Sequence, residues 1–145
     1  MKTVAAILKH KGHQVTKVDP ALPVAGVVDV LVEHRIGAVL VIDHAEQLLG
    51  IVTERDIVRS LVTNGARTLD MTASQLMTSI VQFADPGTTV TEAMTMMTEG
   101  RFRHIPVVEA DRLVGLVSIG DVVKARIMEQ EDEVDSLRAY VGGPA

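Results

Sequence analysis

Two kinds of hydrophobic pattern alternate along the chain. Apolar residues spaced three, four and seven apart predict helices with one buried face, over residues 24–31 and 90–97. Continuous apolar runs bounded by polar turns predict buried strands. Four such runs occur, at residues 38–42, 48–52, 105–108 and 113–117. Each helix is followed by two of these runs, so the chain presents the same order of elements twice.

The two halves also share residues at matching positions. Asp19-Pro20 recurs as Asp85-Pro86, and Gly50-Ile-Val-Thr53 recurs as Gly115-Leu-Val-Ser118. A β-rich stretch precedes each Asp-Pro turn, and a second helix begins after each second strand. Each unit therefore reads β-α-β-β-α, and the predicted fold class is α+β with two repeats.

Helices are also expected at both ends of the chain. We expect residues 1–66 to form the first repeat with an N-terminal helix, residues 67–76 a linker with a short helix, and residues 77–145 the second repeat with a C-terminal helix. The C-terminal helix carries an apolar stripe that needs a partner surface, which favours a homodimer. The stripe consists of Ile127, Val134, Leu137 and Val141.

Composition excludes several classes of function. Aromatic residues make up only 2% of the chain and the net charge is −5, which argues against a nucleic-acid-binding surface. The absence of cysteine excludes thiolate catalysis and cysteine–zinc sites. His10 and His13 have a metal-like spacing but no evident third ligand, so no metal site is expected. No apolar run is long enough for a bilayer and no signal peptide is evident, so we expect a cytoplasmic protein without membrane contact.

The candidate chemistry lies in a turn that occurs twice. Thr53 and Ser118 each end a strand, and Asp56 and Asp121 each follow three residues later at a helix start. A carboxylate in this place suits the two vicinal hydroxyls of a ribose, and the free N–H groups of a helix start suit an anion. The alternative is a capping box, which satisfies the helix N–H groups and binds nothing. Duplication at equivalent positions favours a binding role.

The repeated pattern resembles the CBS (cystathionine β-synthase) domain family over most of the chain. The resemblance rests on Gly50-Ile-Val-Thr53-Glu-Arg-Asp56, Arg103-His-Ile-Pro106 and Gly115-Leu-Val-Ser118-Ile-Gly-Asp121. It implies two repeats packed through their sheets around a pseudo-two-fold axis, with clefts that take AMP, ADP, ATP, NAD or S-adenosylmethionine. It further implies that Thr53, Asp56, Ser118 and Asp121 hold ribose, and that adenine is flanked by Val15, Val39, Val81 and Ile105.

The resemblance also implies an asymmetry between the clefts. Arg103 and His104 stand where the family often places phosphate-binding cations, ahead of Ile105 and the strand proline Pro106. Their counterparts in the first repeat are the uncharged Gly37 and Ala38, and Leu40 replaces the proline. We expect the cations to serve phosphates, in the cleft whose ribose is held by Asp56. The alternative is that Arg103 pairs with a surface acid such as Glu99.

Two functions remain open from the sequence. The first is a non-catalytic regulatory module that binds an adenine nucleotide and acts as a homodimer, with an unidentified protein as the regulated partner. The second is a dimerisation and protein-interaction module without a ligand. An enzyme is disfavoured, because the chain shows no nucleophile–base pair, metal cluster or catalytic acidic pair.

Overall fold

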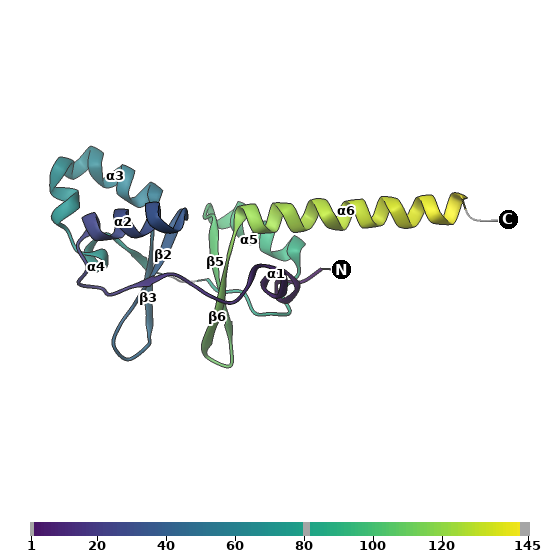
Figure 1. Ribbon diagram of the computed structural model, residues 1–145, viewed down its shortest axis with the longest axis horizontal. Helices are drawn as coiled ribbons and strands as arrows, with labels where there is room; N and C mark the ends of the chain where they lie inside the picture. The colour runs from purple at the N-terminus through teal and green to yellow at the C-terminus, as the bar shows by residue number, and fades with distance from the viewer. Residues whose placement is uncertain (1, 80–81, 143–145) are drawn as a thin grey trace. The chain divides into compact units, whose positions relative to one another are not determined.

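The computed structural model describes residues 2–79 and 82–142 (Figure 1). Their contacts divide the chain into two units, which we describe separately. The first repeat is Gln14–Val81, and the second repeat combines Gln82–Ala145 with the N-terminal segment Met1–His13. Among the described residues, no helix is long and apolar enough to cross a membrane.

The first repeat is built on a four-stranded sheet of order β1-β2-β3-β4. Strand β1 runs parallel to β2, whereas β2–β3 and β3–β4 are antiparallel. The elements are β1 (Lys17–Val18), α2 (Val24–His34), β2 (Ala38–Ile42), β3 (Leu48–Thr53), α3 (Glu54–Asn64), a 3-10 helix (Gly65–Asp70), α4 (Ala73–Leu76) and β4 (Thr78–Ser79).

The apolar face of α2 covers this sheet. Val24 and Val27 are fully buried against the inward side chains of β2 and β3, among them Val41 and Val52. The helix ends at Arg35, which adopts the left-handed conformation that stops a helix (φ 55°). The three-to-four spacing of the valines therefore predicts this core correctly.

The second repeat has the same helix–strand–strand–helix order. Strands β5 and β6 form an antiparallel pair whose register places His104 opposite Ser118. Val90 and Met97 on α5 pack against Ile105 and Val117 on the strands. The elements are α1 (Val4–Lys11), α5 (Val90–Gly100), β5 (His104–Glu109), β6 (Arg112–Ser118) and α6 (Ile119–Gly142).

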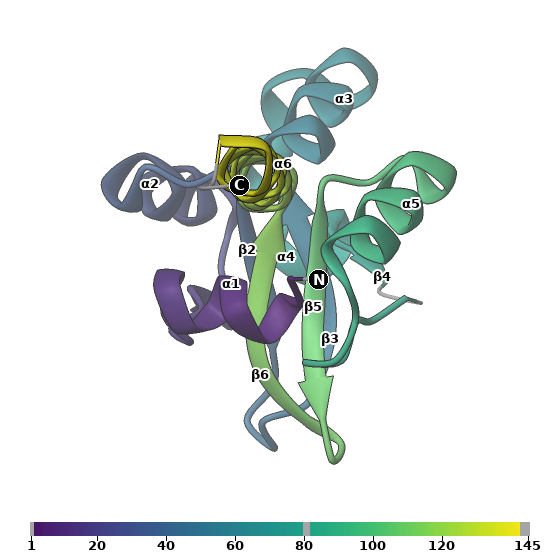
Figure 2. The ribbon, with the colours of Figure 1, turned by 90° about the vertical axis from the view of Figure 1, so that its right-hand side faces the viewer.

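Helix α1 belongs to the second repeat by its contacts, although the sequence groups it with the first. Leu8 is only 1% exposed and lies over Gly115 of β6, where an added Cβ would come within 2.6 Å of the leucine side chain. The N–H of Val4 donates to the carbonyl of Thr88 at 2.8 Å. Figure 2 shows α1 alongside β6. The helix needs an apolar cover, and β6 provides it.

The stretches that open the two repeats are shorter than expected. Strand β1 covers only Lys17–Val18, so Val15 precedes it without joining the sheet. In the second repeat Val81 lies outside the described residues, and Ala84 forms a single parallel bridge with Val107. Conversely, β4 pairs with β3 of the first repeat, although the sequence analysis places Thr78 and Ser79 at the start of the second repeat. The hydrophobic pattern does not indicate this strand, because both of its residues are exposed.

Candidate functional site

Thr53 ends β3 and caps α3, and Asp56 closes the same turn. The Thr53 hydroxyl oxygen accepts a hydrogen bond from the N–H of Asp56 at 3.2 Å. In return, Oδ2 of Asp56 accepts from the N–H of Thr53 at 2.8 Å. This reciprocal pair is a capping box, so the structural role that the sequence allows for the motif is present.

The other oxygen of Asp56 has a partner from β4. Oδ1 accepts a hydrogen bond from the hydroxyl of Thr78 at 3.2 Å. The β3–β4 register pairs Thr78 with Ile51, and an added Cβ on Gly50 would lie 2.7 Å from the Thr78 carbonyl. Glycine at position 50 thus lets β4 approach closely enough for Thr78 to reach the carboxylate, a contact that sequence analysis missed.

Ser118 and Asp121 repeat the turn at the junction of β6 and α6. The N–H of Ser118 donates to Oδ2 of Asp121 at 2.8 Å, and the N–H of Asp121 donates to the Ser118 hydroxyl oxygen at 3.2 Å. Both side chains are partly buried, as are those of Thr53 and Asp56. The duplicated sequence therefore produces duplicated geometry.

Asp121 also holds a cation from the N-terminal helix. The Lys11 ammonium donates to Oδ2 of Asp121 at 2.6 Å and to the carbonyl of Leu116 at 2.8 Å. Burial alone would raise the pKa of Asp121, but the hydrogen bonds from Lys11 and Ser118 hold it below its ordinary value of 3.8. The lysine side chain is 36% exposed and the carboxylate 23%, so the pair borders solvent. Lys11 is the second site residue that sequence analysis missed.

Arg103 and His104 lie next to this turn. His104 stands opposite Ser118 in the β5–β6 pair, and the carbonyl of Arg103 accepts from the N–H of Ile119 at 2.8 Å. Burial, followed by the positive charges of Lys11 and Arg103, lowers the pKa of His104, against the opposing effect of Asp121. Its Nδ1 is buried and has no hydrogen-bond partner within the described parts of the chain. The ring therefore gives up its proton more readily than an ordinary histidine, next to the cations Lys11 and Arg103.

The Arg103 side chain is exposed and free of acidic partners. No ion pair joins it to Glu99 or to any other acidic residue among residues 2–79 and 82–142. At the matching place in the first repeat, the carbonyl of Gly37 accepts from the N–H of Glu54 at 3.0 Å, and Ala38 pairs with Thr53. The backbone arrangement is thus conserved between repeats while the charge is present only in the second.

The expected adenine-flanking residues have different surroundings. Val39 and Ile105 are fully buried in the cores of their own repeats. Pro106 is buried as well, and its carbonyl accepts from the N–H of Ala84 at 2.9 Å. Val15 is half-buried just ahead of β1. Among the expected site residues, the structure thus brings together two turns, each on its own repeat, and the cations of the second.

The CBS domain family matches the chain twice, over residues 5–63 and 73–128. The chain belongs to the CBS domain family. The CBS pair is a regulatory type of module, and the α+β fold with two repeats and flanking helices is confirmed. The two matches contain both hydroxyl-x-x-Asp turns, so the capping boxes described above are a feature of each CBS repeat in this chain.

Relatives and solved structures agree with this assignment. The mitochondrial CBS domain-containing protein CBSX3 of Arabidopsis thaliana is 38% identical over 117 residues, which cover 78% of this chain and 57% of that protein. The CBS-domain containing protein ATU1752 of Agrobacterium tumefaciens is 44% identical with a TM-score of 0.84, and the match covers 86% of this chain and 92% of that one.

A more distant solved structure shares the fold and contains bound ligands of its own. The CBS domain pair of protein MJ0100, solved in complex with 5′-methylthioadenosine and S-adenosyl-L-methionine, has a TM-score of 0.76 and 23% identity. The match covers 90% of this chain and 98% of that one. At this identity the likeness shows the shared fold alone. The chain spans less than two thirds of the length of the first curated relatives, CBSX3 and a 17.7 kDa protein of Acidianus ambivalens.

Proposed function

We propose that this CBS pair is a non-catalytic sensor that binds an adenine nucleotide of the AMP, ADP, ATP or NAD type. The observation that carries the proposal is the duplicated hydroxyl-x-x-Asp turn, built with the same hydrogen bonds at the end of β3 and of β6. In each turn Oδ2 of the aspartate is used by the capping box, and Oδ1 lies outside it. A capping box needs only one of these oxygens, so Oδ1 can accept from a ligand, at Asp56 in place of the Thr78 hydroxyl.

A ribose diol fits such a carboxylate. Two vicinal hydroxyls donate two hydrogen bonds to one carboxylate, and bonds to a charged acceptor are stronger than bonds between neutral groups. At Asp56 a ribose hydroxyl replaces the Thr78 hydroxyl, which is a neutral and exposed donor. At Asp121 no described residue donates to Oδ1, while Lys11 remains beside it as a counter-charge. Adenine would then lie along the strands that carry Val39 and Ile105, next to Val15.

The phosphates would be read by the cations of the second repeat. Arg103 is exposed and carries no acidic partner in the described part of the chain, and its planar fork of N–H groups suits phosphate oxygens. His104 supplies a second donor at the same strand start. Lys11 adds a second positive charge, beside Arg103, within reach of the same turn.

The ligand-free alternative is favoured by a specific observation. Both aspartates already take part in complete capping boxes, and the apolar stripe on α6 is exposed, from 46% at Val134 to 76% at Val141. A module that works through helix contacts alone would show the same features. In both cases we propose that the chain acts as a homodimer.

Mass spectrometry of the small molecules released from denatured, freshly purified protein tests the proposal. We expect an adenine nucleotide in the released fraction, and calorimetry with the same compound should then give a saturable heat with the native protein. The sensor proposal fails if no adenine compound is released and if adenosine, AMP, ADP, ATP and NAD all give no binding heat. That result would leave the interaction module as the function.

A further inference from the structure

The C-terminal part of α6 carries a row of side chains at alternating spacings of three and four residues. Ile127 is 49% exposed, Val134 46%, Leu137 64% and Val141 76%. This spacing keeps one side of a helix facing one partner helix, as in a coiled coil. We name the row the α6 seam; its residues are Ile127, Gln130, Val134, Leu137 and Val141.

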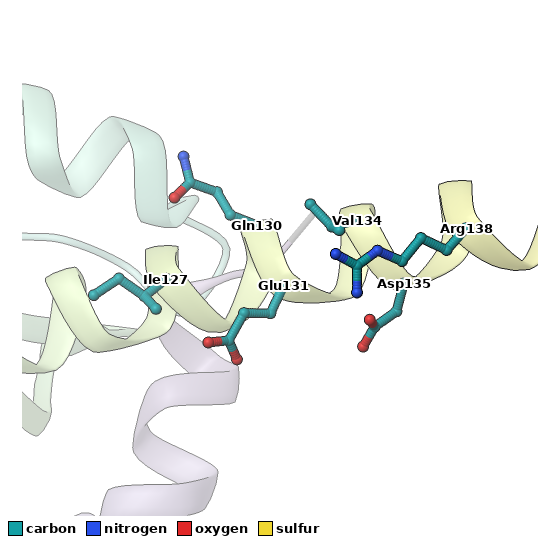
Figure 3. A pocket seen from close by; sticks show the side chains of 6 residues that line it. All are labelled: Ile127, Gln130, Glu131, Val134, Asp135 and Arg138. Carbon is teal, nitrogen blue, oxygen red and sulfur yellow. The ribbon is translucent and has the colours of Figure 1, made fainter.

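The α6 seam is separate from the side of α6 that packs on its own repeat. Val122 is fully buried, and Ala125 and Glu129 are each 9% exposed. Lys2 of the N-terminal segment pairs with Asp132 at 3.7 Å, on the continuation of that inward side. Figure 3 shows Gln130 and Val134 projecting together from one side of α6, with Glu131 and Asp135 projecting from another. The seam therefore stays open after the repeat has folded.

We infer that the α6 seam packs against the α6 seam of a second copy of this chain, as a parallel two-stranded coiled coil. The inference rests on the proposed homodimer but not on the bound nucleotide. It goes further by naming the orientation of the two helices, the register and the residues that select them.

The charges that flank the seam select the parallel orientation. In a parallel pair, the residue just before Ile127 or Val134 faces the residue five positions later on the partner helix. Arg126, which lies 3.6 Å from Glu129 and 3.8 Å from Glu133 of its own helix, then also faces Glu131 of the partner subunit. Glu133 faces Arg138 of the partner subunit. Two-fold symmetry repeats both pairs, so every facing charge pair at these positions is attractive.

The antiparallel orientation with full overlap reverses this outcome. In this orientation Val134 packs against Gln130 of the partner subunit. Glu131 then lies next to Glu131 of the partner subunit. Glu133 likewise lies next to Glu133 of the partner subunit. Like charges in these places destabilise the pair. Antiparallel registers shifted by one heptad avoid the repulsion. A shift in one direction leaves Ile127 without an apolar partner, and a shift in the other direction leaves Leu137 and Val141 without one.

Gln130 supports the same orientation independently. In the parallel pair it faces Gln130 of the partner subunit, and each side-chain amide both donates and accepts a hydrogen bond. In the antiparallel pair it faces a valine, which leaves a polar group buried without a partner. A single polar layer within an apolar seam is a recognised device for fixing register.

Disulfide trapping tests the register. The chain has no cysteine, so each introduced thiol is unique. Leu137→Cys places the two thiols in one layer of the parallel pair, whereas full antiparallel overlap separates them by about 15 Å along the axis. Ser136→Cys, on the neighbouring position away from the seam, is the matched control. We expect rapid oxidation to a covalent dimer for Leu137→Cys and none for Ser136→Cys.

Charge reversal tests the selection of orientation. Glu133→Arg and Arg138→Glu each place like charges opposite one another, so each should weaken the dimer about fivefold, and the double variant should restore it. Asp135→Arg changes the charge by the same amount on the outer side of α6 and should leave the dimer unchanged. Sedimentation equilibrium of each variant gives the dissociation constant, and calorimetry with the nucleotide is run on the same samples.

Four results would overturn the inference in distinguishable ways. A mixed disulfide between Ile127→Cys and Leu137→Cys copies would show an antiparallel pair. If the single charge reversals leave the dissociation constant unchanged, or the double reversal does not restore it, the flanking charges do not select the orientation. A dimer that resists both tests would place the interface elsewhere. A monomer at micromolar concentration would remove the seam and the proposed homodimer together, while unchanged nucleotide binding would leave the sensor proposal standing.

Discussion

The two hydroxyl-x-x-Asp turns have the same hydrogen bonds but different neighbours. Asp56 receives a neutral hydroxyl from Thr78, whereas Asp121 receives the Lys11 ammonium and lies in the repeat that carries Arg103 and His104. The two turns have the same backbone, and the segments that reach them decide the charge around each aspartate. These segments are β4, which pairs with β3 in the first repeat, and α1, which packs on β6 in the second. Similar backbones therefore give one aspartate a neutral hydroxyl partner and place cations beside the other.

The difference in charge predicts that the two sites contribute differently to ligand binding. A neutral surrounding accepts a nucleoside group without preference for its charge, while a cluster of cations favours anions and loses that preference in salt. We expect the first-repeat turn to contribute mainly ribose binding. The second-repeat turn should contribute most of the discrimination between adenosine and its phosphates.

Loss of either aspartate should have the largest effect on binding. Removing a carboxylate that accepts charge-assisted hydrogen bonds should cost about 1.5–3 kcal/mol, roughly ten- to hundredfold in affinity. Calorimetry on Asp56→Ala and Asp121→Ala, with exposed Asp135→Ala as the control, ranks the two sites. If neither change weakens the binding of any nucleotide, both turns serve only as helix caps. The difference between the two turns then has no role in ligand binding.

The double change Arg103→Ala, His104→Ala should remove the anion preference of the second repeat. We expect AMP and ATP to bind about tenfold more weakly and with less dependence on salt, and adenosine to bind as before. Arg112→Ala removes an exposed charge from the far end of the β5–β6 pair and serves as the control.

Two other outcomes of that measurement are informative. Equal losses for adenosine and ATP, or no loss for either, would show that these residues do not read phosphate. Combining the double change with Asp56→Ala and with Asp121→Ala then identifies the ribose site that shares a ligand with them, because only coupled residues give non-additive losses.

Stability should depend on pH through His104, which has no titratable counterpart in the first repeat. Its pKa in the folded protein lies below the ordinary value of 6.5, so the unfolded chain binds the proton more readily. Stability is therefore fully present above pH 6.5 and falls as the pH drops from there through the lowered pKa, by at most about 1.4 kcal/mol per pH unit. His104→Gln should flatten this part of a denaturant-derived profile. An unchanged slope in the variant would assign the dependence to other groups.

Lys11 should have the smallest effect, and it is specific to the second repeat. Lys11→Met removes a positive charge that lowers the pKa of both His104 and Asp121, so both pKa values should rise. An NMR titration of the His104 ring measures the first change, with Lys9→Met on the same helix as the control. A His104 pKa that does not move would mean that burial, Asp121 and Arg103 set it without a contribution from Lys11.

The parts of the fold that repeat locally were predictable from the sequence. The apolar run at 38–42 coincides with β2, and the three-to-four spacing from Val24 predicts the buried face of α2. The positions of both aspartates at helix starts also follow from the pattern. These features depend on neighbours within a few residues, which is the range that periodicity and capping signals report.

The contacts that distinguish the two sites were not predictable in this way. Lys11 reaches Asp121 across a separation of 110 residues, and Thr78 reaches Asp56 from a strand of two exposed residues. Neither carries an apolar period or a cap signal. The roles of Thr53, Asp56, Ser118, Asp121, Arg103 and His104 in binding stay predictions, because a capping box and a ribose site share the same turn.

The packing of α1 on β6 has a consequence for how the chain is made. The first thirteen residues leave the ribosome before the rest, yet they belong to the unit that is completed last. Gly115, which Leu8 contacts, and Asp121, which Lys11 contacts, are synthesised only after all strands of the first repeat. A nascent chain stalled after residue 81 would thus contain one complete repeat and an N-terminal arm without its cover. Synthesis of β6 provides that cover and joins α1 to the second repeat.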